Sequence, residues 1–204
     1  MKRRKQNIRT YKIIIKILLV FLILSGGYSY LFHDKNSIEG YHVDALSINH
    51  QFLTINPYSR SGDSLPQVKG IVIHYTANPK SSAKNNRNYF ENLKNTHLTK
   101  ASSHFIIGLE GEIIQCIPLN EISYASNHRN GDTISIECCH PDNSGRFTNE
   151  TYNSLQKLVK SLMETYNLDK NDVIRHYDIT GKECPKYFVT YPQKWEEFKN
   201  ALED

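Results

Sequence analysis

The sequence predicts an α/β fold: a single domain with a central mixed β-sheet flanked by helices, preceded by an N-terminal transmembrane helix. Short β-branched runs are interspersed with amphipathic segments of helical period, which is the pattern of an α/β architecture. The chain opens with basic residues followed by an apolar run, which indicates the membrane segment. Setting the leader aside leaves about 170 of the 204 residues, enough for about one domain with a sizeable core.

The leader has a basic tip over residues 1–12 and an apolar run over residues 13–32. The run reaches the roughly 20 residues that a membrane-spanning helix needs. The positive-inside rule places the tip in the cytoplasm and everything after the run outside. No Ala-x-Ala site follows the run, which favours an uncleaved anchor over a signal peptide. We therefore expect a single-pass protein of the cell membrane with an extracytoplasmic domain, which would be secreted if the leader were cleaved.

Residues 33–65 are polar and turn-prone, and we interpret them as an extracytoplasmic tether before a domain over residues 66–204. The run at 70–75 predicts a buried strand, and residues 81–95 predict a surface helix. Apolar runs at 103–109 and 113–117 flank a Gly-containing turn, which is typical of a β-hairpin.

The second half of the domain continues the same pattern. Residues 133–138 predict a strand whose alternation places Ile134 and Ile136 on one face and Glu137 on the other. Thr148 is the expected N-cap of a helix through Asn167. Short runs at 173–176 and 195–202 predict a strand and a closing helix. One apolar stripe along the longer helix should face the core: Tyr152, Leu155, Leu158, Val159, Leu162, Met163 and Tyr166.

Charge and cysteine content exclude some classes of protein. The formal net charge is +4, much of the basic excess sits in the leader, and no basic stripe with interleaved aromatics follows residue 40. Nucleic acid is therefore not an expected partner. The four cysteines lack the regular spacing of a disulfide scaffold. Export would permit a bridge from Cys116 to Cys138 or Cys139, but the pattern does not indicate one.

Three side chains offer donors for a metal ion: His74, His176 and Cys184. Each histidine ends a short apolar run, and the cysteine follows a glycine closely. Three protein ligands and one position open to water are what a catalytic zinc site requires. Taken singly, a histidine beside a strand is more often a hydrogen-bonded group than a ligand, and this long spacing matches no local metal motif.

Four segments occur in an order that changes that balance: IHYT (73–76), SHFII (103–107), TISIE (133–137) and RHYDITGKECP (175–185). Together they resemble the N-acetylmuramoyl-L-alanine amidase family, which is related to phage lysozyme-type amidases and peptidoglycan recognition proteins. The resemblance covers about residues 68–190 and is most specific in its last segment. It implies Zn²⁺ bound by His74, His176 and Cys184, with Glu137 and Lys182 in catalytic roles. Glu137 would act as general base and then acid, and Lys182 would stabilise the oxyanion.

The chain departs from some relatives at one position. Those relatives place a catalytic tyrosine just before the histidine of the second segment, where this chain has Ser103. Glu137 therefore becomes the critical group, and His104 is expected to pack within its strand. Further residues near the motifs are candidates for contacting substrate: Tyr75, Asn78, His128 and Thr180.

Three functions are compatible with these residues. The first is zinc-dependent hydrolysis of the amide bond between N-acetylmuramic acid and L-alanine in peptidoglycan, by a monomer. The second is a module that binds peptidoglycan without cutting it. The resemblance implies that such modules commonly lose the metal-binding cysteine, which is present here. The third is a cysteine hydrolase using Cys184, which we rank last because we expect no helix start after Pro185 to lower the thiol pKa.

Overall fold

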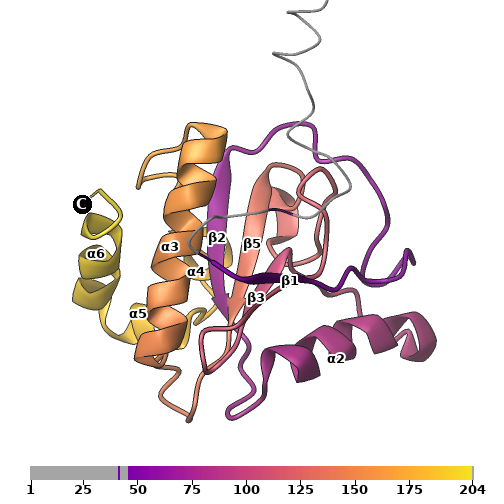
Figure 1. The fold of residues 1–204 in the computed structure, drawn as a ribbon, viewed down its shortest axis with the longest axis horizontal. Coiled ribbons are helices and arrows are strands. Elements are labelled where there is room, and N and C mark those ends of the chain that lie inside the picture. Colours follow the sequence, from indigo (N-terminus) through magenta and orange to yellow (C-terminus); the bar gives the residue numbers. More distant parts are fainter. Residues whose placement is uncertain (1–40, 42–45, 204) are drawn as a thin grey trace, which may run out of the picture. The chain divides into compact units, whose positions relative to one another are not determined.

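Six strands form one mixed sheet in the computed structural model, which describes residue 41 and residues 46–203. The strands lie in the order β1-β4-β3-β5-β2-β6 (Figure 1). Their bounds are β1 (Ile48–His50), β2 (Gly70–Tyr75), β3 (Phe105–Ile107), β4 (Ile113–Gln115), β5 (Thr133–Cys138) and β6 (Val173–Arg175).

The strand directions explain why polar residues gather at one edge of the sheet. β3, β5, β2 and β6 run parallel to one another, whereas β4 is antiparallel to β3 and parallel to β1. The carboxyl ends of the four parallel strands therefore lie at the same edge. His74 is the register partner of Glu137, and Ile73 is the partner of Arg175, so the chain leaves β6 beside His74.

Helices cover both faces of the sheet (Figure 1). One face packs against α3 (Asn149–Tyr166), α5 (Lys186–Thr190) and α6 (Pro192–Asn200), and α2 (Ala83–Thr96) covers part of the other. The first core includes Ile71, Ile73, Ile134 and Ile136 of the strands with Leu155, Leu158, Leu162, Phe188, Trp195 and Phe198 of the helices. The second includes Ile106, Ile114, Ala83, Phe90 and Leu93.

The position of α2 leaves room for a polar site. This helix packs on β3 and β4, at one side of its face of the sheet. On the same face, β5 and β2 present Ser135, Glu137 and His74, because side chains alternate along a strand and register partners share a face. The uncovered part of this face is where the candidate site lies.

The structure confirms the predicted α/β domain with a mixed sheet and helices on its faces. The strands at 70–75 and 133–138, the hairpin of β3 and β4, and the helix capped by Thr148 all form. α2 begins at Ala83, after the N-cap Ser82, rather than at Ser81. The polar face of β5 is covered rather than solvated, since Thr133 and Ser135 are buried.

Several elements differ from the expectations. β1 and the buried Leu53 and Leu65 belong to the segment interpreted as a tether, so the folded domain includes residues before 66. We expected no helix start after Pro185, but α5 begins at the next residue. All four cysteines lie in the described part of the chain and are free, so Cys116 is not bridged to Cys138 or Cys139.

The predicted basic tip (1–12) and transmembrane anchor (13–32) lie outside the described residues. Within residue 41 and residues 46–203, no helix has both the length and the apolar character that crossing a bilayer requires.

Candidate active site

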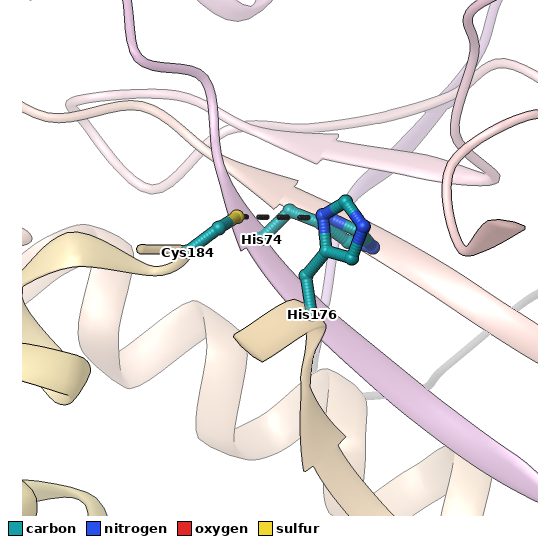
Figure 2. A group of neighbouring side chains, drawn as sticks. All are labelled: His74, His176 and Cys184. Carbon is teal, nitrogen blue, oxygen red and sulfur yellow. Dashed lines mark hydrogen bonds between the residues drawn. The ribbon is translucent and has the colours of Figure 1, made fainter. Parts of the chain in front are cut away.

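Three predicted metal donors converge at the carboxyl edge of the parallel strands (Figure 2). His74 belongs to β2, His176 begins α4 (His176–Thr180), and Cys184 follows α4. The Sγ atom of Cys184 lies 3.8 Å from Nδ1 of His74, and the two imidazole rings are 4.7 Å apart between centroids. One ligand atom from each residue lies within 4.8 Å of the others, and all three side chains are buried.

Local structure around Arg175 fixes the position of His176. The carboxylate of Asp178 accepts from the backbone N–H of Arg175 at 2.8 Å and from its guanidinium at 2.7 Å. Nη1 of the same guanidinium donates to the carbonyl of Phe188 at 2.9 Å. α4 then ends at Gly181, whose φ of 75° is left-handed, a conformation that glycine adopts without strain. The chain therefore turns back and brings Cys184 beside His74.

Unpartnered buried atoms indicate that the donor set is built for a cation. Nδ1 of His176 and Oε2 of Glu137 are buried and have no hydrogen-bond partner, although buried polar atoms in folded proteins are nearly always satisfied. Atoms that share a tetrahedral metal ion such as zinc lie about 3.5 Å apart, because Zn–N and Zn–S bonds are about 2.0 and 2.3 Å long. The separation between Cys184 and His74 fits that spacing, so the residues present fit a divalent metal ion.

A groove of about 430 Å³ opens beside the three donors. Glu137 and Lys182 both line it, as does Tyr75. Its other wall includes Lys100 and Tyr124, with the ammonium of Lys100 5.5 Å from the centre of the Tyr124 ring. The donor cluster is therefore reachable from solvent by a ligand larger than water.

Burial governs the ionisation of the site. It lowers the pKa of His74 well below the usual value, with smaller effects of His176 and Lys182 in the same direction, and it also lowers the pKa of His176. Burial raises the pKa of Glu137 to about 8, against the opposing charge of Lys182. It raises the pKa of the Cys184 thiol to about 12. Without a cation, the imidazoles are therefore neutral at pH 7, while the carboxyl group and the thiol are protonated.

The structure does not place every predicted substrate-binding residue in the groove. Tyr75 lines it, but the residues lining it do not include Asn78, His128 or Thr180. Asn78 lies in the turn after β2, where its carbonyl accepts from the hydroxyl of Ser81 at 2.6 Å. The hydroxyl of Thr180 donates to the carbonyl of His176 at 3.2 Å, within α4. The backbone carbonyl of Asn78 is thus bonded within its own turn, and the hydroxyl of Thr180 is bonded within its own helix.

Ser103 and His104 also face inward. Ser103 is fully buried, and its hydroxyl donates to the carbonyl of Phe105 at 2.8 Å. His104 is fully buried as well, and it bonds Ser135 and the carbonyl of Glu121. The position where some relatives have a catalytic tyrosine therefore contributes no side chain to the groove, and His104 packs within the sheet as expected.

The loop at residues 125–130, which carries His128, reaches both histidines. Oγ of Ser126 lies 3.4 Å from Nε2 of His74, and Oδ1 of Asn127 lies 2.9 Å from Nε2 of His176. No spacing rule singles out these two residues, and the only signal is the polar, turn-prone composition of residues 125–130.

Solved structures similar to this chain include a catalytic domain and an endolysin. The catalytic domain of XlyA superposes with a TM-score of 0.66 at 27% identity, covering 77% of this chain and 99% of that domain. A mutant endolysin from Bacillus subtilis superposes with a TM-score of 0.65 at 28% identity, with the same two coverages. The described part of this chain therefore has the fold of these catalytic domains, with a donor cluster at the carboxyl edge of its parallel strands.

Sequence comparison identifies the family. The family model described as N-acetylmuramoyl-L-alanine amidase matches residues 64–187. The N-acetylmuramoyl-L-alanine amidase BlyA of Bacillus subtilis (strain 168) is 34% identical over 172 residues, which cover 74% of this chain. The chain belongs to the N-acetylmuramoyl-L-alanine amidase family. It spans about half the length of the curated relatives it matches, 45% in the case of BlyA.

Proposed function

We propose that this chain is a zinc-dependent N-acetylmuramoyl-L-alanine amidase that hydrolyses the bond between N-acetylmuramic acid and L-alanine in peptidoglycan. The observation that carries the proposal is the convergence of His74, His176 and Cys184 beside Glu137 in an open groove. Membership of an amidase family supports the choice of bond.

His74, His176 and Cys184 would hold the metal ion. Two imidazoles and one thiolate are ligands that zinc favours, and three protein ligands leave a position for catalysis. When bound, zinc supplies Lewis acidity that polarises the scissile carbonyl and lowers the pKa of water. Its positive charge also favours the ionised forms of Cys184 and Glu137, which burial disfavours in the metal-free protein.

Glu137 performs the proton transfers in this mechanism. Its carboxylate takes a proton from the attacking water as the water oxygen bonds the carbonyl carbon. It then returns that proton to the amide nitrogen as the carbon–nitrogen bond breaks, so the products are the lactyl carboxyl group of the sugar and the free amine of L-alanine. Burial increases the affinity of the Glu137 carboxylate for that proton, since it raises the pKa of the group to about 8 in the metal-free protein.

Lys182 stabilises the charge that develops during attack. Its ammonium lines the groove with Glu137 and contributes to the electrostatics of both histidines. A fixed positive charge aimed at the carbonyl oxygen lowers the barrier because negative charge appears there only as the reaction proceeds.

The direct test is digestion of purified peptidoglycan and of a defined muropeptide, with products identified by mass spectrometry. We expect free stem peptides with an L-alanine amino terminus, loss of cleavage with a chelator and recovery with zinc. Glu137→Gln should lower turnover by about 10²- to 10⁴-fold and keep the zinc content. The matched control is Glu164→Gln, an exposed carboxylate on α3, which should behave as wild type. Undiminished cleavage by Glu137→Gln would remove the assigned base.

The same assay separates the proposal from its alternatives. Saturable binding of peptidoglycan with no product on prolonged incubation would indicate a recognition module. An active preparation free of metal would indicate a thiol hydrolase using Cys184, although the raised pKa of that thiol opposes this mechanism.

We also propose that the leader anchors the enzyme in the cell membrane with its catalytic domain outside, as the basic tip and apolar run predict. Protease added to intact cells without a wall should then digest residues 46–203 and leave the leader membrane-bound. Protection of the domain until the cells are lysed would contradict this location.

A further inference from the structure

The loop at residues 125–130 contacts both histidines on the side away from Cys184. Nδ1 of His74 faces the thiol at 3.8 Å, and Nε2 of the same ring faces Oγ of Ser126 at 3.4 Å. His176 repeats this polarity, because its Nε2 faces Oδ1 of Asn127 at 2.9 Å while its Nδ1 is buried without a partner. Each ring therefore has one nitrogen directed at the loop and one left for the metal centre.

We propose that Asn127 is a positioning residue of the metal centre, which accepts the Nε2–H of His176 and thereby leaves the Nδ1 lone pair of that ring for the ion. The inference rests on the proposed function, since it assumes that these donors hold zinc. An amide oxygen is only an acceptor, so the ring nitrogen facing it must carry the proton. A neutral imidazole has one N–H, so Nδ1 is then unprotonated.

The loop is shaped to hold Asn127 in this place. Oδ1 of Asn130 accepts from the backbone N–H groups of Ala125 at 3.1 Å and Ser126 at 2.6 Å, which closes the loop. Asn127 then begins the short 3₁₀ helix η1 (Asn127–Arg129) with a left-handed φ of 53°. Among residues with a Cβ atom, asparagine tolerates this conformation best. The 3₁₀ helix η1 in turn packs against α4, which carries His176.

The energetic reason is general to metal sites. A ligating histidine commonly donates its other N–H to an oxygen, which fixes the tautomer and the ring orientation, and loss of that oxygen weakens metal binding about 10- to 100-fold. Nδ1 of His176 is buried and has no hydrogen-bond partner, as expected of a ring nitrogen that is reserved for a metal ion. A purely structural role for Asn127, tying η1 to α4, would not require that nitrogen to be free.

The positive φ provides a clean set of variants. Asn127→Gly keeps the left-handed backbone and removes the oxygen, whereas Asn127→Asp keeps an oxygen in the same place. Asn167→Gly is the matched control, because Asn167 also has a φ of 53° but caps α3 and is exposed away from the groove.

The test is zinc affinity of the full chain, measured by competition with a chromogenic chelator. We expect Asn127→Gly to bind zinc about 10- to 100-fold more weakly than wild type, with Asn127→Asp and Asn167→Gly close to wild type. If Asn127→Gly binds zinc as tightly as wild type, the role of Asn127 is refuted while the proposed function stands. The same conclusion follows if Asn127→Asp loses as much zinc affinity as Asn127→Gly. A wild-type chain that binds no zinc would overturn the proposed function as well.

A second measurement does not depend on the variants folding. Ring ¹⁵N shifts of histidine in the metal-free wild-type chain report which nitrogen carries the proton. We expect His176 to be the Nε2–H tautomer. A proton on Nδ1 would refute the role of Asn127, because that nitrogen would then be a donor and not a ligand.

Discussion

Replacing His104 by asparagine is expected to remove a defined part of the sensitivity of this fold to acid. The neutral ring uses both nitrogens: Nδ1 accepts from the backbone N–H of Ser135 at 3.0 Å, and Nε2–H donates to the carbonyl of Glu121 at 2.9 Å. A second proton on Nδ1 would break the first bond and leave a charge inside the sheet. Protonation is therefore unfavourable in the folded state and ordinary in the unfolded chain.

The size of the effect follows from the pKa. Burial lowers the pKa of His104 from 6.5 to about 4, and the bond to Glu121 offsets only part of that shift. Because the pKa of His104 is lower in the folded state than in the unfolded chain, the neutral ring contributes its full share of stability above pH 6.5. That share is lost as the pH falls toward 4. One pKa unit corresponds to about 1.4 kcal/mol, so the full loss is about 3 kcal/mol, of which about 2 kcal/mol has appeared at pH 5.

The assay is urea unfolding of the full chain at pH 8 and pH 5, with a chelator present so that metal binding does not contribute. Asparagine at position 104 places an amide oxygen near the site of Nδ1 but does not titrate. Both proteins retain the same other ionisable groups, including His74 and His176, so their pH dependence cancels in the comparison. Wild type should lose about 2 kcal/mol more than His104→Asn between the two pH values. Equal losses would show that His104 is not held neutral by the fold.

Two further predictions concern the groove and the core. Lys182→Met should lower turnover by about 10²- to 10³-fold with zinc affinity retained, because a charge that stabilises an oxyanion acts mainly on the reaction step. Steady-state kinetics and a zinc titration would check this prediction. An unchanged rate would remove Lys182 from the mechanism. Leu158→Ala should lower the free energy of unfolding by about 2–5 kcal/mol, since Leu158 is fully buried. Leu98→Ala, at a side chain 77% exposed, should change it by less than about 0.5 kcal/mol, and chemical denaturation would compare the two.

The parts of the fold that the sequence predicts are those with a repeating pattern. The run at 70–75 is a continuous β-branched run, and the stripe through Leu155, Leu158 and Leu162 has the period of a helix; β2 and α3 form there. α4 could not be predicted from the sequence, because five residues are too few to show a helical period. β1 is not predicted from the sequence, because its three residues lie in a polar segment without the pattern of a strand. They form a strand by pairing with β4.

The site divides in the same way. The motif order places His74, His176 and Cys184 together, and the structure gives the reason: parallel pairing of β2 with β5 and β6 aligns the ends of the runs that carry them. Strand register is not readable from alternation, yet a slip of one residue would turn Glu137 to the other face. Ser126 and Asn127 could not be chosen from the sequence, because they act through a loop conformation that only the packed sheet and α4 define.

The wide separation of the donors along the chain has a consequence for when the enzyme becomes competent. His74 and Cys184 are 110 positions apart, and His176 adopts its place only once β6 has joined β2. In a chain that is incompletely synthesised or not yet folded, these donors therefore lie apart and form no shared metal site. On the proposed function, the metal site would therefore be complete only after β6 has joined β2, and the proposed peptidoglycan cleavage would begin only in the folded domain.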